Sequence, residues 1–256
     1  MKRFLVVGVL GGLLMLPLLV NKMAAICLTT TDNGLLPVGV QPLVSDILKE
    51  WRAGSIVSRK EVLEYGLDSC FCAMPIPANV FRRMKGRSYK NDCTVRLSDL
   101  RYVRLLYYNF KGQVKLGELI CNKSVSDDLV EIFRELFEHH YPIESVLLVD
   151  YFEANDEMSM RANNSSCFNY RVVKGSSKLS LHSQGRAIDI NPLYNPCVRL
   201  RTHTVQPATG RRYANRKDNF PYKISPSDIC YQLFVKHGFR WGGNWKTIKD
   251  YQHFER

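Results

Sequence analysis

The chain has 256 residues, of which 45% are hydrophobic and 23% are charged, an ordinary globular composition for one core with appendages. Its net charge of +12 suits an anionic partner such as a wall polymer, an acidic peptide or a membrane. No helix-turn-helix, RNP or zinc-finger pattern accompanies the charge, so we expect no nucleic-acid partner. The basic residues are spread along the chain. An ordinary solvent-exposed basic surface without an anionic partner is therefore an equally good interpretation of the net charge.

The first 25 residues have the organisation of an export signal. A basic start precedes an apolar run over 4–20, and small residues follow it. The run is slightly long for a signal and slightly short for a spanning helix. We therefore expect an exported protein of the periplasm or cell envelope, with 1–25 acting as a cleaved signal peptide or as a retained membrane anchor. Lipidation of Cys27 is a third route, which the bulky Ile26 disfavours.

Eight cysteines are many for a cytosolic protein, and export makes disulfides plausible. Their pairing cannot be read from the sequence, and buried free thiols are a serious alternative. Cys70 and Cys72 are one residue apart, which is not the spacing of a zinc knuckle, so a structural cysteine–zinc site is not expected.

Residues 26–75 are predicted to form a linker and a short helical extension. The stretch 28–40 is rich in small, polar and turn-forming residues, as in a linker. Apolar spacing predicts short helices over 41–51 and 59–65. A Pro-Ile-Pro stretch then breaks the chain before a catalytic domain predicted over 76–256.

Within this domain, residues 126–140 predict a helix capped by Ser126, with acidic residues in its first turn. Residues 145–150 and 187–190 predict buried strands, and 225–237 predict a second helix. Helices and strands mix without regular alternation. We therefore expect an α+β fold with a small antiparallel sheet flanked by helices.

One segment has the residues of a metal site. His182 precedes Gly185, which can make a tight turn, and an alternating strand follows. In that strand Asp189 lies between Ile188 and Ile190. Burying a carboxylate between two isoleucines costs free energy unless an opposite charge lies beside it, and a metal ion would supply that charge.

A second segment, near the chain end, offers another histidine and another carboxylate, His253 and Asp250. Two histidines and one aspartate would leave a tetrahedral zinc with one open position for a water. Zinc lowers the pKa of such a water to about 7. A free carboxylate nearby can take its proton and pass it to the leaving amine, and Asp250 is well placed in the sequence for this role.

Several motifs in this order resemble the zinc D-alanyl-D-alanine carboxypeptidase family of bacteria. That family includes the vancomycin-resistance D,D-peptidases and the L-alanyl-D-glutamate endopeptidases of phage endolysins. The motifs are Ser-x-His-x-x-Gly-x-Ala-x-Asp over 180–189, Asp-x-x-His-Phe over 250–254, Gly-Phe-x-Trp-Gly-Gly-x-Trp over 238–245 and the segment 163–171 that ends in Tyr-Arg. The last two favour the endopeptidase branch, and the resemblance covers roughly 75–256.

The resemblance implies a zinc ion (Zn2+) bound by His182, Asp189 and His253, with Asp250 as the catalytic acid and base. It also implies that Arg171 holds substrate or the developing oxyanion, because a guanidinium donates two parallel hydrogen bonds. A plain ion pair with a surface acid is the alternative for Arg171.

Two further residues receive expected roles from the same motifs. Ser180 would bind substrate or brace the site, and its alternative role is that of a turn or cap residue. Trp241 would contribute to substrate binding, although the tryptophan-rich run around it is also expected to form the wall and core around the site.

The implied function is hydrolysis of peptidoglycan stem-peptide bonds by a zinc metallopeptidase, as a D-alanyl-D-alanine carboxypeptidase or an L-alanyl-D-glutamate endopeptidase. We expect a monomer with possible membrane attachment through its N-terminal segment. The alternatives are a non-catalytic wall-binding module on the same fold and a zinc peptidase with a non-wall peptide substrate.

Overall fold

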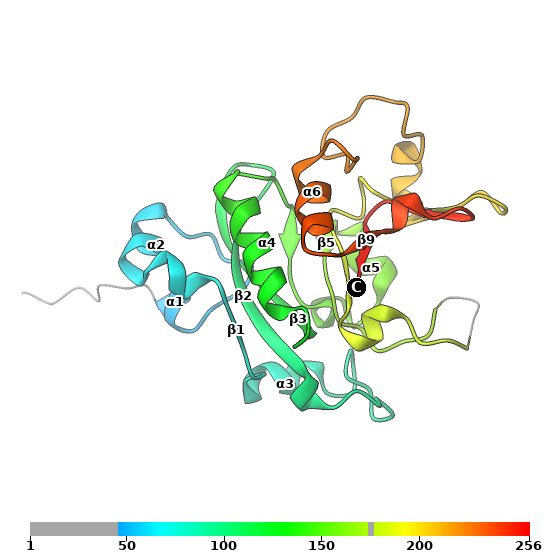
Figure 1. The fold of residues 1–256 in the computed structure, drawn as a ribbon. Coiled ribbons are helices and arrows are strands. Elements are labelled where there is room, and N and C mark those ends of the chain that lie inside the picture. Colours follow the sequence, from blue (N-terminus) through cyan, green and yellow to red (C-terminus); the bar gives the residue numbers. More distant parts are fainter. Residues whose placement is uncertain (1–45, 174–176) are drawn as a thin grey trace, which may run out of the picture. The chain divides into compact units, whose positions relative to one another are not determined.

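The computed structural model describes residues 46–173 and 177–256. The predicted export signal, the linker and Cys27 lie outside these residues. Helices and short antiparallel strands are mixed in the described part (Figure 1), which confirms the α+β class. Its antiparallel strands form three separate three-stranded sheets, whereas the sequence predicted one small sheet. No helix within the described ranges is both long and apolar enough to cross a membrane.

The elements follow one another along the chain with short connections. The helices are α1 (Asp46–Lys49), α2 (Arg59–Tyr65), α3 (Ala78–Met84), α4 (Ser126–Glu138), α5 (Asp156–Arg161) and α6 (Ile229–Lys236). The strands are β1 (Cys72–Met74), β2 (Leu100–Tyr108), β3 (Val114–Asn122), β4 (Ser145–Val146), β5 (Asn164–Ser165), β6 (Ala187–Asp189), β7 (Cys197–Arg199), β8 (Thr204–Gln206), β9 (Arg240–Trp241), β10 (Ile248–Asp250) and β11 (His253–Glu255). Single 3-10 turns include η3 (Val149–Phe152), η4 (Leu181–Gln184), η5 (Ala208–Tyr213) and η6 (Gly242–Asn244).

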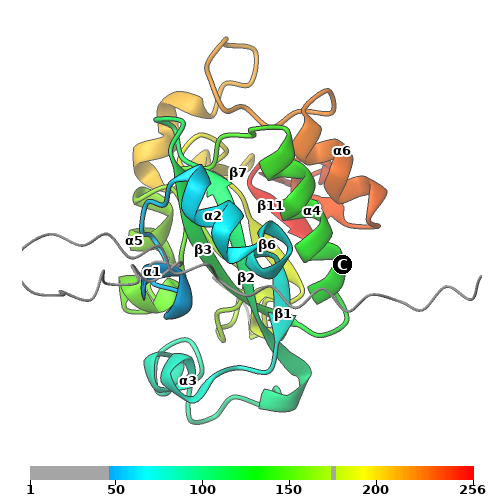
Figure 2. The same cartoon turned by 90° about the vertical axis from the view of Figure 1, so that its left-hand side faces the viewer.

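The main core lies between the β1-β2-β3 sheet and the helix α4, which packs across it (Figure 2). The apolar stripe of α4, formed by Leu129, Ile132, Phe133 and Leu136, is buried. Ser126 does not cap this helix, because Val125 occupies the cap position and the Ser126 hydroxyl donates to the Lys123 carbonyl. Acidic residues do fill the first turn, where they favour the positive end of the helix dipole.

The extension before residue 75 contributes to the same core. Leu48 and Trp51 are buried, and the Trp51 indole donates to the Gly117 carbonyl of β3 at 3.0 Å. The helix predicted over 59–65 is confirmed as α2, and Ser58 caps it in a reciprocal capping box. The boundary proposed at residue 75 stays a prediction.

Two predicted elements are shorter than expected. Strand β4 ends at Val146 because the Asn164 side chain bonds both the N–H and the carbonyl of Leu147, where a neighbouring strand would pair. A 3-10 turn follows in place of the predicted strand to residue 150. The helix α6 begins at Ile229, where the Asp228 carboxylate accepts from the N–H of Cys230.

The seven cysteines in the described part are free thiols. Four of them are buried: Cys70, Cys121, Cys167 and Cys230. At these four positions the structure agrees with buried free thiols, which the sequence left open as the alternative to disulfides.

Two small C-terminal sheets position the chemistry. One has the order β6-β11-β9, and the other has the order β10-β7-β8. The turn η6 connects β9 to the loop that leads into β10, and it packs against β10 and β11. The last two strands of the chain, β10 and β11, therefore belong to different sheets, and η6 packs against both.

Candidate metal centre

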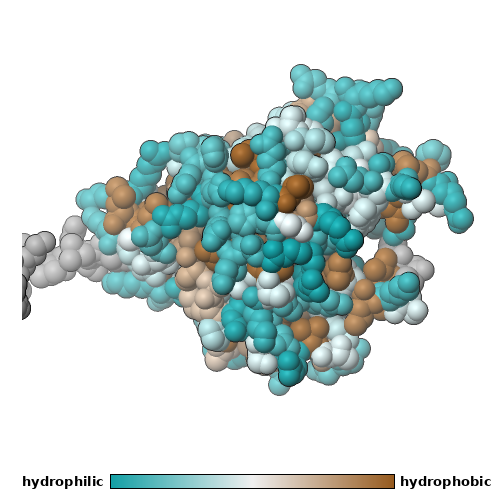
Figure 3. Space-filling view, viewed as in Figure 1, coloured by the Kyte–Doolittle hydropathy of each residue, from teal (hydrophilic) through white to brown (hydrophobic). Residues whose placement is uncertain are grey.

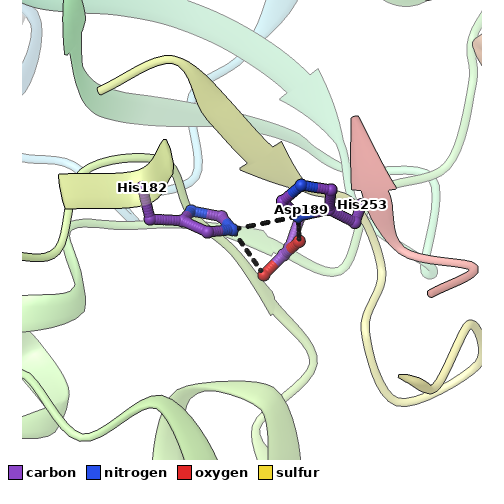
Figure 4. A group of neighbouring side chains, drawn as sticks. All are labelled: His182, Asp189 and His253. Atoms are coloured by element: carbon purple, nitrogen blue, oxygen red, sulfur yellow. Dashed lines mark hydrogen bonds and ion pairs between the residues drawn. The ribbon is translucent and has the colours of Figure 1, made fainter. Parts of the chain in front are cut away.

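Three predicted ligands converge on one point from three different elements (Figure 4). His182 lies in the turn η4, Asp189 in β6 and His253 in β11. The two strands pair antiparallel, with Asp189 directly opposite His253. One ligand atom from each of the three side chains lies within 4.8 Å of the others. All three side chains are largely shielded from solvent, so their charges interact strongly.

Gly185 makes the turn that returns the chain from His182 to β6. Its φ is +67°, a left-handed conformation that glycine adopts readily. A Cβ at this position would lie 2.6 Å from the backbone nitrogen of Asn122 and 2.9 Å from the carbonyl carbon of Cys121. The absence of a side chain thus allows the turn to rest against β3, where the Asn122 N–H donates to the Gly185 carbonyl at 2.8 Å.

Gly185→Ala should therefore lower the free energy of unfolding by about 2–3 kcal/mol, from backbone strain plus the clash with β3. Gly112→Ala is the matched control, because Gly112 also has a positive φ, +70°, but open space around its Cβ position. We expect that control to cost about 1 kcal/mol. Urea unfolding of both variants measures the difference, and equal losses would contradict the close approach to β3.

The outer hydrogen bonds of the two histidines fix which ring nitrogens are free. His182 Nδ1 lies 2.6 Å from the Cys167 carbonyl, which can only accept, so this nitrogen donates. In the neutral ring His182 Nε2 then keeps its lone pair, and it points at the centre of the cluster. His253 Nε2 lies 3.2 Å from a Glu255 carboxylate oxygen and donates to it. His253 Nδ1 consequently faces the centre.

These two inward nitrogens are only 3.2 Å apart. Asp189 lies beside them, with one oxygen 3.1 Å from His253 Nδ1 and the other 3.3 Å from His182 Nε2. Two lone pairs at this distance repel each other unless a proton or a cation lies between them. Two imidazole nitrogens and one carboxylate, each oriented by outer hydrogen bonds, are the donor set of an open metal site. The residues therefore fit a metal ion.

Without a metal, the chain neutralises this cluster with a proton. Burial alone would lower the pKa of His253, but hydrogen bonds to Asp189 and Glu255 raise that pKa to about 10. Burial likewise would raise the pKa of Asp189, but the adjacent His182 and His253 hold it far below its usual range. The metal-free cluster thus contains a protonated His253 beside an ionised Asp189, and a bound metal ion would take the place of the proton.

Asp250 lies next to this cluster on β10, directly opposite Cys197 of β7. Its Oδ1 is buried and has no hydrogen-bond partner in the described part of the chain. Burial raises the pKa of the Asp250 carboxyl, and the positive charge of His253 acts in the opposite direction. A Cβ at Gly242 would lie 2.9 Å from the Asp250 Cβ and 3.3 Å from the His253 Cβ, so this glycine packs close to both residues.

A cavity of about 580 Å³ opens over these residues. Its lining includes His182, Asp189, Asp250 and His253 together with Arg171, Ser180, Arg199, Met160, Val172, Leu179 and Trp245. The hairpin that contains Val172 and Leu179 supplies an apolar side, and those two side chains are 48% and 39% exposed. The cavity therefore combines a charged floor with an apolar side, as expected for a site that binds a peptide.

Arg171 and Ser180 both line the cavity, and both also have structural partners. The Arg171 guanidinium pairs with Asp156, which is the ion pair considered as its alternative role. The Ser180 hydroxyl accepts from the N–H of His182 at 3.2 Å and caps η4. It braces the turn that carries the first histidine.

Trp241 takes the core position, which was one of the two roles expected for the tryptophan-rich run. Its indole is buried, donates to the Tyr251 carbonyl at 2.9 Å and packs against the Tyr231 ring, and it does not line the cavity. Trp245 lines the cavity instead, with its ring centroid 5.1 Å from that of His253. Trp245 is therefore the tryptophan that is placed to contact a ligand in the cavity.

Sequence reasoning missed Glu255 as a member of the site. It lies two residues after His253 on the same strand, so both side chains point to the same face. Glu255 receives the His253 Nε2–H, and its other oxygen pairs with Arg240 at 2.9 Å. The His-x-Glu spacing within a predicted strand is the signal that could have identified it.

We expect Glu255→Ala to weaken zinc binding by roughly 10–100-fold, because the His253 ring loses the acceptor that orients it. Glu255→Gln should weaken binding less, since its amide oxygen can still accept. Arg240→Gln is the control for loss of the outer ion pair, and its side chain is 74% exposed. Competition with a coloured chelator measures the affinities, and unchanged affinity in Glu255→Ala would exclude the orienting role.

Comparison with known proteins supports the chemistry of this centre. Residues 174–256, which contain the three ligand candidates and Asp250, match the family model described as D-alanyl-D-alanine carboxypeptidase. This match confirms the resemblance predicted from the motifs and supports a metallopeptidase. Searches of curated proteins and of solved structures found no match.

Proposed function

We propose that the protein is a zinc-dependent peptidase that hydrolyses peptidoglycan stem-peptide bonds. The match of residues 174–256 to the family model described as D-alanyl-D-alanine carboxypeptidase supports this proposal. One observation carries the proposal. Two histidines with oriented, inward-facing nitrogens and one aspartate converge beside Asp250, whose Oδ1 is buried and has no hydrogen-bond partner among the described residues, in a cavity of about 580 Å³. Nitrogen and carboxylate donors in this number suit zinc.

In this proposal His182 Nε2, Asp189 and His253 Nδ1 hold the zinc ion. When bound, zinc supplies Lewis-acid activation of a water and of the scissile carbonyl. Asp250 accepts the proton of the attacking water on its free Oδ1. Asp250 then donates that proton to the amide nitrogen as the C–N bond breaks, so the amine leaves neutral and Asp250 returns to its carboxylate form.

Arg171 and Trp245 position the substrate. The guanidinium lies at the cavity wall, where it donates to a substrate carboxylate or to the oxygen on which negative charge develops. Asp156 fixes its orientation from behind through their ion pair. The Trp245 ring and the apolar hairpin exclude water from the backbone of the bound peptide.

We also propose that the protein acts outside the cytoplasm, in the periplasm or cell envelope. The basic start and apolar run at the N-terminus support export. A retained N-terminal segment would keep the peptidase at the membrane beside its substrate.

The test is to incubate the zinc-loaded full chain, purified in detergent, with purified peptidoglycan and to identify the released fragments by mass spectrometry. The chelator-treated protein and His182→Ala are the controls. We expect new peptide ends only with the zinc-loaded wild type. Loss of a terminal D-alanine would identify a carboxypeptidase, and cleavage after L-alanine would identify an endopeptidase. A folded, zinc-loaded protein that releases nothing would refute the proposal.

A further inference from the structure

Basic residues occur along the whole chain, but their excess over acidic residues is concentrated in two short segments. Residues 196–223 and 245–249 together contain nine Lys and Arg and a single Asp, a surplus of eight. The other 223 residues share the remaining surplus of four. These 33 residues therefore carry two-thirds of the net charge of the protein.

The two segments are neighbours in the structure. Strands β7 and β8 form a hairpin, β10 pairs with β7 on its other side, and η5 follows β8 and packs against it. In Figure 1 this sheet and the loops around it project at the right and upper right of the molecule. Figure 3, in the same orientation, shows these projecting ends as hydrophilic. We call this region the basic sheet.

Most cations of the basic sheet have no internal partner. None of its nine Lys and Arg residues forms a salt bridge with a described carboxylate. Arg216, Lys223 and Lys249 are used within the fold, because they donate to backbone carbonyls and, for Arg216, also to Asn195. The other six have no side-chain hydrogen bond or salt bridge to a described residue, and one of them, Arg212, lies over the Tyr213 ring. These six are available to an anion: Arg199, Arg201, Arg211, Arg212, Lys217 and Lys246.

The basic sheet begins at the cavity itself. Arg199 and Gln206 line the cavity and lie on β7 and β8. Arg199 is two residues from Cys197, which faces Asp250 across the sheet. A polymer held in the cavity can therefore continue over the hairpin tip, toward Arg201 and Lys246, without leaving positive surface.

The chemistry of this surface selects the kind of partner. Leu200 is its one exposed large hydrophobic side chain among the described residues, which is too little for insertion into a membrane. Apart from Trp245, which lines the cavity, its Phe, Tyr and Trp side chains are buried or half-buried, so the surface outside the cavity offers none of these rings for stacking with a single-stranded nucleic acid. Four of the six available cations are arginines, which bind planar carboxylates bidentately.

We propose that the basic sheet is a binding surface for the carboxylates of peptides that neighbour the scissile one on the same wall polymer. This inference rests on the proposed function, because it takes the polymer in the cavity to be peptidoglycan. The surface raises the local concentration of an anionic, repetitive substrate and leaves the chemistry at the metal centre unchanged.

The test uses three exposed cations that do not line the cavity, in the variant Arg201→Gln, Arg211→Gln, Lys246→Gln. The matched control, Arg82→Gln, Lys85→Gln, Lys90→Gln, removes the same charge from exposed, unpaired residues in and after α3. Both triple changes are made in Asp250→Asn protein, so that binding is measured without hydrolysis. The probe is purified insoluble peptidoglycan, freed of phosphodiester-linked polymers by hydrofluoric acid, and the readout is cosedimentation.

We expect the basic-sheet variant to bind roughly tenfold more weakly than the control at low salt, with the difference largely lost near 0.3 M salt. Equal binding by the two triple variants would overturn the proposal. Loss of wild-type binding after hydrofluoric acid treatment would also overturn it, because the partner would then be a phosphate polymer. Matching urea midpoints exclude a folding defect.

A second measurement separates this proposal from the proposed function. With Asp250 intact, the basic-sheet variant should keep the wild-type kcat/KM on a short soluble stem peptide and lose it on the polymer. In one outcome no variant cleaves either substrate, but the basic-sheet variant still binds peptidoglycan more weakly than the control. The peptidase proposal then fails and the binding surface stands. If both substrates are cleaved equally well by all variants, the binding surface fails and the peptidase proposal stands.

Discussion

Asp250→Asn should reduce kcat for stem-peptide hydrolysis by roughly 10²–10⁴-fold, the usual contribution of a general base. Asparagine has the shape of aspartate but cannot accept the proton of the attacking water. Zinc content should be unchanged, because Asp250 lies outside the group of three ligand atoms. Asp218→Asn, which removes an exposed carboxylate from the loop after η5, is the control and should keep full activity.

The same carboxyl should set the acidic limb of the pH profile. Burial raises its pKa, and the base must be ionised to act, so activity should fall as the pH drops through that raised value. A raised carboxyl pKa also means that the ionised form destabilises the folded chain at neutral pH. The metal-free Asp250→Asn protein should therefore be at least as stable as the wild type in urea. A variant that loses stability and zinc together with activity would assign Asp250 a structural role.

Half of the candidate metal centre could be predicted from the sequence because the constraints on His182 and Asp189 are local. His182 and Asp189 are joined by one glycine turn, and the alternation of a strand fixes the face on which Asp189 lies. The pairing of β6 with β11 is long-range, and only the family motifs indicated it. Once that register exists, Asp189 and His253 must face each other.

What the sequence left undecided or missed has a separate physical cause at each position. Asn164 takes the hydrogen bonds that would have extended β4, and no periodicity signals this. In the tryptophan-rich run, both indoles fit an apolar wall, but the direction of each side chain depends on η6. The turn directs Trp241 into the core and Trp245 to the cavity. Glu255 was missed because a motif identifies ligands more readily than the residues that orient them.

The proton that His253 holds in the metal-free protein gives the last prediction. Zinc binding at neutral pH should release about one proton, because His253 is protonated in the metal-free chain, with its pKa raised to about 10, and a ligand must be neutral. This proton alone should lower the apparent Kd for zinc roughly tenfold per pH unit between pH 7 and 9, and ionisation of the zinc-bound water would steepen the fall. Calorimetry in two buffers of different ionisation enthalpy counts the proton. Binding that releases none would contradict the protonated cluster.

The same proton should make the stability of the metal-free protein decrease with rising pH, whereas its affinity for zinc increases. A histidine whose folded pKa exceeds its unfolded value stabilises the fold fully below about pH 6.5, and this contribution is lost as the pH rises toward about 10. The metal-free protein should thus unfold more easily from pH 7 to 10, whereas zinc, which replaces the proton, should remove this dependence. Glu255→Ala provides the control, because loss of one of the two acceptors that raise the His253 pKa should reduce both the proton release and the alkaline loss of stability.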